Sequence, residues 1–251
     1  MKKIFVFIAA CAMTVVASAQ IVSSTSRSLV KNEYANYNRI FVSYSPMSFS
    51  GDGSKGKENP FNNTAGGFTF GWLGGWSVSQ TMPLYIEAGL NLKYNHWGDE
   101  NTESASDNYN GYNISVSLKE KESMNFLNLN VPVNISYKYS FSGVDGLSIA
   151  PYLGLHFTGN LIGNFKYEYD ITASAAGYSD SEGDETELNF FDEDDMNGSD
   201  NTANRFQLGW QIGVGLNYKK LYLGIGYSAE FSEYAEKLNT GGMTLTLGLN
   251  F

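Results

Sequence analysis

Leu84-Tyr85-Ile86-Glu87-Ala88-Gly89-Leu90-Asn91-Leu92-Lys93-Tyr94 decides the fold class, because its apolar residues fall on every second position without a break. Successive side chains of a β-strand point to opposite faces, so one face of this segment is apolar. The other face holds Tyr, Glu, Gly, Asn and Lys. Such a difference between faces is typical of a wall between lipid and a polar lumen.

The same alternation recurs in seven other segments, although it is weaker in the two nearest the N-terminus. Pro132 interrupts one segment, and we expect a β-bulge there because proline has no N–H to give to a ladder. The pattern predicts an all-β fold with eight antiparallel strands, at residues 39–47, 67–78, 84–94, 127–139, 147–157, 206–218, 221–231 and 243–251.

The connections between these segments are alternately long and short. Residues 48–66, 95–123 and 159–204 form long gaps, whereas 79–83, 140–146 and 219–220 are short. A transmembrane barrel with long outer loops and short periplasmic turns has this alternation. Ile114-Ser115-Val116-Ser117-Leu118 also alternates inside a long gap. Two alternatives therefore stay open for this segment: it extends the wall above the membrane, or it belongs to a ten-stranded barrel.

The composition agrees with an exported barrel. Aromatic residues make up 15% of the chain and charged residues only 17%, against about 25% charged residues in ordinary soluble domains. Beyond the N-terminus there is no apolar run of the ~20 residues that a membrane-spanning helix needs. A pI of about 4.6 and the lack of a Lys/Arg cluster exclude a nucleic-acid partner.

The N-terminus has the pattern of a secretory signal peptide. Lys2 and Lys3 precede an apolar run that closes on Ala17-Ser18-Ala19, a small-residue cleavage site. We predict a signal peptide over 1–19, a periplasmic segment over 20–38 and an outer-membrane β-barrel domain over 39–251. The one cysteine, Cys11, would leave with the signal peptide; a lipoprotein box at Cys11 is a weaker alternative.

The interior of an eight-stranded barrel is just wide enough to be filled by side chains. The polar faces therefore point inward and the apolar faces point to lipid. The predicted lumen-facing polar residues are Glu87, Lys93, Asn134, Lys138, His156, Arg205, Gln207, Gln211 and Glu230. Glycines on the same faces would make room for Tyr85, Tyr152 and Tyr222, and aromatics near strand ends, Trp97 among them, would form interfacial girdles. A soluble, lipocalin-like periplasmic binding barrel, with the apolar faces inside, remains the alternative.

The last segment, Met243-Thr244-Leu245-Thr246-Leu247-Gly248-Leu249-Asn250-Phe251, resembles the terminal strand of Gram-negative outer-membrane β-barrels, a family that includes porin-like, PorT-like and OmpA/OmpW-like small barrels. The resemblance implies that Leu245, Leu247, Leu249 and Phe251 form the insertion signal read by the barrel-assembly machinery. It also implies a place in the cell outer membrane and contact with its lipid.

Few residues suggest chemistry. The two histidines, His96 and His156, lack a local serine-hydrolase motif, so we assign no catalytic, cofactor-binding or metal-binding residue. The acidic stretch 180–200 is expected to be a mobile outer loop; divalent cations are possible partners for its carboxylates.

The sequence thus predicts a non-enzymatic outer-membrane protein with a structural, surface-interaction or narrow-conduit role. An outer-membrane enzyme acting on envelope lipid is the second possibility.

Overall fold

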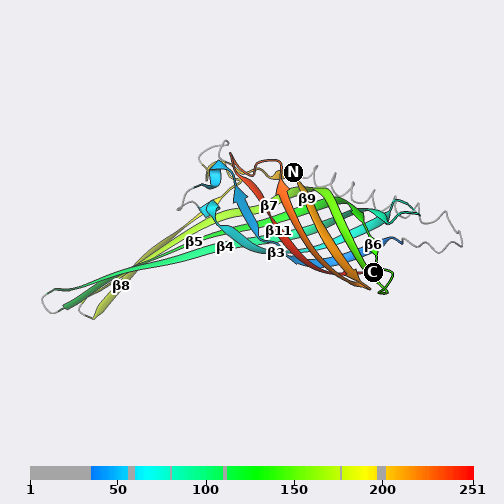
Figure 1. The fold of residues 1–251 in the computed structure, drawn as a ribbon. Coiled ribbons are helices and arrows are strands. Elements are labelled where there is room, and N and C mark those ends of the chain that lie inside the picture. The colour runs from blue at the N-terminus through cyan, green and yellow to red at the C-terminus, as the bar shows by residue number, and fades with distance from the viewer. Residues whose placement is uncertain (1–34, 56–59, 80, 110–111, 176, 197–201) are drawn as a thin grey trace.

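The computed structural model describes residues 35–55, 60–79, 81–109, 112–175, 177–196 and 202–251 (Figure 1). The predicted signal peptide, and residues 20–34 of the predicted periplasmic segment, lie outside these residues. Two short 3₁₀ helices, η1 (Asp52–Ser54) and η2 (Pro60–Asn62), accompany the strands. The strands are β1 (Tyr37–Tyr44), β2 (Met47–Ser50), β3 (Thr64–Ser77), β4 (Leu84–Tyr109), β5 (Tyr112–Tyr137), β6 (Tyr139–Ser140), β7 (Leu147–Ala175), β8 (Tyr178–Asn189), β9 (Phe206–Tyr218), β10 (Leu221–Glu230) and β11 (Asn239–Asn250).

Eight strands close into a ring in the order β1-β11-β10-β9-β7-β5-β4-β3, and β3 pairs with β1 again. All these pairings are antiparallel. At the seam between the first and last strands, the N–H groups of Asn38 and Phe251 each donate to the other residue's carbonyl at 2.9 Å. The prediction of eight strands is confirmed, and the ten-stranded alternative is wrong because residues 114–118 belong to β5.

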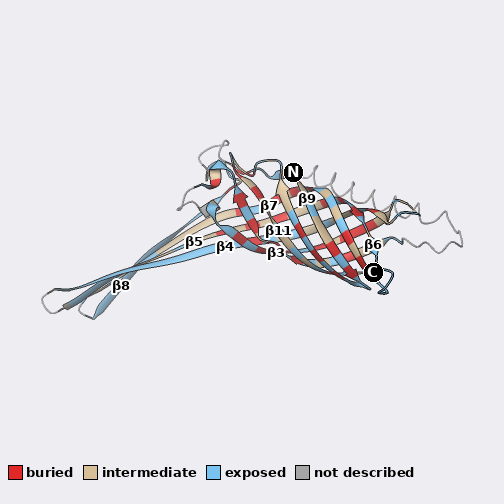
Figure 2. Ribbon diagram, viewed as in Figure 1, coloured by how far each residue is buried: buried red, intermediate tan, exposed pale blue. Residues whose placement is uncertain are grey.

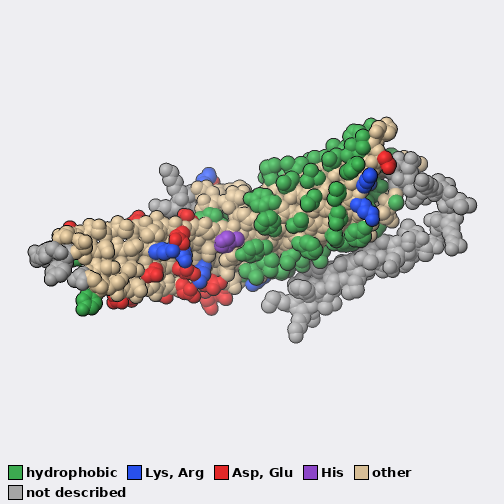
Figure 3. All heavy atoms as spheres, turned by 90° about the horizontal axis from the view of Figure 1, so that it is seen from below, with side chains coloured by type: hydrophobic (Ala, Val, Ile, Leu, Met, Phe, Trp, Pro, Cys, Tyr) green, Lys and Arg blue, Asp and Glu red, His purple; other side chains and the backbone are tan. Residues whose placement is uncertain are grey.

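The two faces of the wall differ as predicted. Along β10, exposed apolar side chains alternate with buried positions (Figure 2). Exposed apolar side chains lie on all eight strands of the ring and form an apolar belt. Figure 3 shows this belt on one face of the barrel half. They include Ile40, Val42, Phe70, Leu92, Leu153, Phe157, Leu223, Ile225, Leu245 and Leu247. Within the described residues, no helix combines the length and the apolarity needed to cross a membrane.

Strands β4, β5 and β7 do not end with the barrel wall. They continue, and with β8 they form a four-stranded arm in the order β4-β5-β7-β8 that projects from one end of the barrel (Figure 1). The arm comprises residues 99–109, 112–122, 165–175 and 178–189. The prediction of loops over 95–123 and over most of 159–204 is therefore wrong, as is the mobile loop at the start of 180–200. Backbone pairing with neighbouring strands forms these strands despite their polar composition.

A register shift marks the boundary between the barrel and the arm on β7. It falls opposite Leu127 and Asn128 of β5, where Leu161 and Ile162 are consecutive exposed residues. The extra residue reverses the alternation of β7 beyond this point. No register shift occurs at Pro132, so the bulge predicted there is wrong; instead the β4–β5 ladder skips the rungs at residues 131 and 132.

An aromatic cap lies at the arm end of the barrel. Its buried members are Met47, Phe49, Ala65, Met124, Phe126, Phe190, Ala203, Tyr234 and Leu238. The rings of Phe126 and Phe190 stack with centroids 5.9 Å apart. Trp97 packs against this cap, so its predicted place in an interfacial girdle is wrong: it lies on the inward phase of β4.

Candidate functional site

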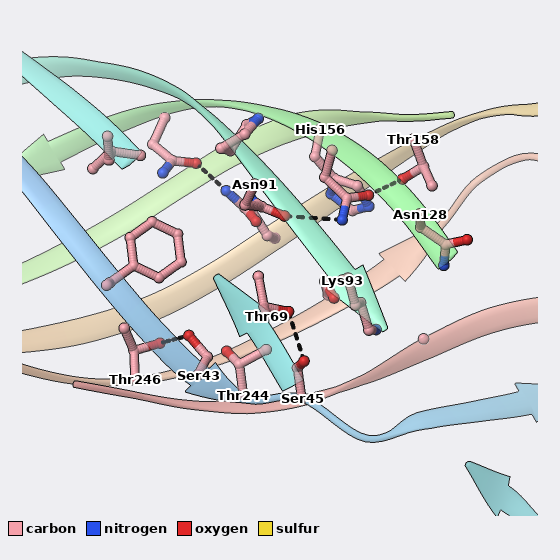
Figure 4. Close-up of a pocket in the computed structure, with 18 of the residues that line it drawn as sticks. Ser43, Ser45, Thr69, Asn91, Lys93, Asn128, His156, Thr158, Thr244 and Thr246 are labelled. Carbon is pink, nitrogen blue, oxygen red and sulfur yellow. Dashed lines mark hydrogen bonds between the residues drawn. The ribbon is translucent and has the colours of Figure 1, made fainter. Parts of the chain in front are cut away.

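The lumen encloses a cavity of about 140 Å³ (Figure 4). Its wall is mostly hydroxyl, amide and charged side chains. Many of these side chains form hydrogen bonds with one another: the Ser45 and Thr69 hydroxyls lie 2.6 Å apart, and the Asn130 amide donates to Asn91 at 3.0 Å. Such a volume holds on the order of several water molecules, which is far from a wide aqueous pore.

The structure brings most of the predicted lumen residues to this cavity. Glu87, Lys93, Asn134, His156, Gln207, Gln211 and Glu230 line it. Lys138 and Arg205 do not, because each lies just beyond the end of a strand. The Lys138 Nζ is 5.7 Å from the ring centroid of Tyr37. Arg205 is exposed, and its guanidinium lies 4.5 Å from the ring centroid of Phe191.

His156 and Glu230 form a buried side-chain contact in the cavity. His156 Nε2 lies 2.9 Å from Glu230 Oε1, and the Thr158 hydroxyl is also 2.9 Å from that oxygen. Among the described residues, no serine hydroxyl bonds to His156, and its Nδ1 has no partner. This arrangement can stiffen the wall by hydrogen bonding.

A second polar layer lies toward the chain termini. The Arg39 guanidinium is 3.4 Å from the ring centroid of Tyr222, and its Nε donates to Asn250 at 2.9 Å. The Tyr37 hydroxyl donates to Glu87. The sequence prediction missed Arg39, although it has the same phase as Ser43 and could have been found from that phase.

Inward-facing glycines make room for the tyrosines, as predicted for Tyr152 and Tyr222. A Cβ on Gly215 would lie 2.2 Å from the Tyr222 ring, and one on Gly213 would lie 2.5 Å from the Tyr152 ring. The cavity therefore lies between the aromatic cap and a tightly filled tyrosine–arginine layer. This geometry closes the lumen toward both ends of the barrel.

The arm presents two chemically different faces. One face, here called the acidic face, continues the lumen side of β4 and β5. Cross-strand register places Asp99, Glu103, Asp107, Glu120, Glu122, Asp180, Glu182 and Asp184 on it. The opposite face, here called the ion-paired face, carries Glu100, Lys119, Lys121, Lys166, Glu168, Asp170, Glu185 and Glu187.

Lysines neutralise carboxylates on the ion-paired face. Lys119 lies 2.7 Å from Glu100 and thereby lowers the pKa of that carboxyl. Lys166 contacts both Glu168 and Glu185, at 2.5 and 2.9 Å, and lowers the pKa of Glu168. On this face three lysines offset part of the charge of five carboxylates.

On the acidic face, by contrast, the pKa of a carboxyl group is raised. Partial burial raises the pKa of Glu122, and the neighbouring carboxylates of Asp99 and Glu120 raise it further. Within the described residues, no group of three acidic, His or Cys side chains is arranged to hold a metal ion. Divalent cations at 180–200 therefore remain a prediction, and residues 197–201 of that stretch lie outside the described residues.

Comparison with known proteins gives a family. Residues 35–233 match the model of the outer membrane protein beta-barrel domain. None of the curated proteins matches the chain.

Solved structures that resemble it include Ail, the attachment invasion locus protein of Yersinia pestis (14% identity, 86% of this chain and 99% of that chain, TM-score 0.35). Neisserial surface protein A is similar at 11% identity (86% and 97%, TM-score 0.36), and a major outer membrane protein from Thermus thermophilus at 13% (86% and 100%, TM-score 0.37). All three TM-scores are low.

The family match covers most of the chain, and the closed ring with its apolar belt agrees with it. In outer-membrane barrels the long connections are extracellular and the short turns are periplasmic, so the end of the barrel that bears the arm is the outer end. The chain belongs to the outer membrane protein β-barrel domain family and is a protein of the outer membrane.

Proposed function

We propose that this protein is a non-enzymatic surface-interaction protein, in which the barrel is the anchor and the arm makes the contacts. The observation that carries the proposal is the arm itself. Its strands extend roughly 35 Å past the wall, at about 3.3 Å per residue, and their side chains are mostly exposed. A membrane anchor alone does not need such an extension.

The closed lumen favours an anchor over a narrow conduit. The aromatic cap and the tyrosine–arginine layer leave only the small polar cavity between them. The apolar belt would contact outer-membrane lipid, and the terminal strand would be read by the barrel-assembly machinery. His156, whose bonded partner is Glu230, gives little support to an enzyme acting on envelope lipid.

An arm-shortened variant tests this function. Residues 99–122 and 167–186 would each be replaced by a two-residue Asn-Gly turn, which suits an antiparallel hairpin. Cells lacking the native protein would produce either form, and their attachment to acidic, neutral and basic protein-coated surfaces would be measured. We expect the shortened form to keep heat-modifiable migration on a denaturing gel and to lose attachment to at least one surface.

Planar-bilayer recordings provide the complementary measurement, and we expect no stepwise currents from either form. Equal attachment by both forms, or regular current steps from the full-length protein, would contradict the proposal.

A further inference from the structure

Charge is segregated between the two faces of the arm. All three lysines of the arm, Lys119, Lys121 and Lys166, lie on the ion-paired face, each within 4.0 Å of a carboxylate. The acidic face holds eight carboxylates and no Lys or Arg. Its negative charge is therefore uncompensated by any described side chain of the arm.

The carboxylates border an apolar strip. In one row of paired residues, Glu103 and Glu182 at the two edges enclose Leu118 and Ile171. In the next row toward the tip, Val116 and Ala173 lie between Ala105 and Asp180. The third row places Asp107, Ile114, Ala175 and Tyr178 side by side.

This strip is open to solvent. Val116 is 43% exposed, Ile114 and Ile171 are each 40% exposed, and Tyr178 is 84% exposed. The β7 bulge produces the strip, since it reverses the phase of β7 and brings Ile171 and Ala173 to the face that carries Val116 and Leu118. A continuous exposed apolar patch with a polar rim is typical of an interaction site.

The chemistry of the acidic face limits its occupant. A second copy of the same face, an anionic lipid surface or a nucleic acid would meet like charges. A bare divalent cation would leave the apolar strip uncovered. We infer that the acidic face binds a cationic polypeptide segment, whose Lys or Arg side chains meet the two edge rows while its apolar side chains cover Val116, Leu118 and Ile171. This inference rests on the proposed function and names the class of partner.

The test uses the full-length protein in detergent and a short fluorescent peptide of lysine, leucine and serine as the probe. Two matched peptides replace its leucines by serine or its lysines by glutamate. Fluorescence anisotropy measures Kd at two salt concentrations. We expect the lysine–leucine peptide to bind most tightly, with an affinity that falls at higher salt because exposed charges are screened.

Two charge variants compare the faces. D180N/E182Q/D184N/E103Q removes four charges from the acidic face, and E100Q/D170N/E185Q/E187Q removes four from the ion-paired face. Loss of four exposed charge contacts should raise Kd about fourfold or more in the first variant, and the second variant should raise it less than about twofold. Heat-modifiable migration and far-UV circular dichroism would establish that both variants fold.

A third variant, V116S, tests the apolar strip and should bring the affinity of the leucine-containing peptide close to that of its serine counterpart. The inference is overturned if both charge variants lose affinity equally, if the two cationic peptides bind equally well, or if only Ca²⁺ binds to the acidic face. When the arm-shortened cells lose attachment but the peptide does not bind, the proposed function stands and this inference alone fails. If the shortened cells attach normally, the proposed function fails.

Discussion

At the residue scale, the tightest constraint in the lumen is the fit of glycine against tyrosine. We predict that Gly215→Ala destabilises the barrel by about 1–3 kcal/mol, because the new methyl group would clash with the buried ring of Tyr222. The urea midpoint of heat-modifiable migration measures the loss. Gly143→Ala is the control, since nothing lies within 4 Å of its added Cβ. Similar midpoints for both variants would contradict the prediction.

The arm carboxylates make a second residue-scale prediction. Partial burial and two neighbouring carboxylates raise the pKa of Glu122. The protonated Glu122 side chain therefore stabilises the arm below its ordinary pKa of 4.5, and this stabilisation is lost as pH rises through the raised pKa. Glu122→Gln should therefore stabilise the arm at neutral pH, by less than about 1 kcal/mol because the site is solvent-screened. The gain should vanish below pH 4.5.

Glu168→Gln should act in the opposite sense. Lys166 lowers the pKa of Glu168, so that carboxylate stabilises the arm above pH 4.5 and loses its effect as pH falls through the lowered pKa. Amide hydrogen exchange of the arm strands, at neutral pH and at pH 4, measures both variants. Equal exchange rates in the two variants at neutral pH would contradict the conclusion that lysines pair with carboxylates on one face of the arm and not on the other.

Sequence phase predicted residues well where the alternation was unbroken. Glu87, Lys93 and His156 line the lumen because their strands keep one phase from the terminal end of the barrel to the cap. Lys138 and Arg205 were assigned by the same phase, but they lie past the strand ends, where phase no longer fixes direction. Ile171 was not placed on a face from sequence, because its phase depends on the bulge at Leu161, which was not predicted although Gly163 lies close to it.

At the scale of elements, the aromatic cap is where tertiary contacts replace strand alternation. Its members come from β2, β3, β5, the segment between β8 and β9, and the segment between β10 and β11. No local pattern predicts that Phe49, Phe190 and Tyr234 meet. Most of the arm was also hidden, because residues 99–109 and 178–189 have the polar composition of loops and become strands only through pairing with β5 and β7. Only residues 114–118 of β5 showed the alternation of an extended wall.

The cap leads to a prediction about Phe126. Phe126→Ala should cost about 3–5 kcal/mol in the free energy of unfolding, because it leaves a cavity among buried rings. Near-UV circular dichroism during urea unfolding reports the change. Phe157→Ala is the matched control: that ring is 55% exposed on the lipid side, so detergent can fill the space. A loss as large for Phe157→Ala would remove the distinction between cap and belt.

At the scale of the whole molecule, Phe251 adds one backbone pair to the β1–β11 seam that closes the ring. The backbone of Phe251 exchanges two hydrogen bonds with Asn38, and its side chain is 64% exposed on the outer surface. We predict that deleting Phe251 lowers the yield of assembled barrel in cells more than it shifts the urea midpoint of protein that has already folded. Heat-modifiable migration measures both quantities. Asn239→Ala, at the other end of β11, should leave the yield unchanged.

The fold class was predictable at this scale because eight alternating segments have few ways to bury polar backbone and expose apolar side chains other than closing a ring in lipid. The length of the arm was predictable only in part: residues 114–118 alternate and indicated an extended wall, whereas the polar partner segments 99–109 and 178–189 show no such pattern.

The continuity of β4, β5 and β7 from the barrel wall into the arm has a mechanical consequence. The arm meets the barrel without a linker, because three of its strands are continuous with strands of the ring. A pull along its length runs parallel to these strands and loads the rungs of the ladders in shear. Many hydrogen bonds then carry the force together, and traction at the tip is delivered to the membrane-embedded ring without a weak joint in between.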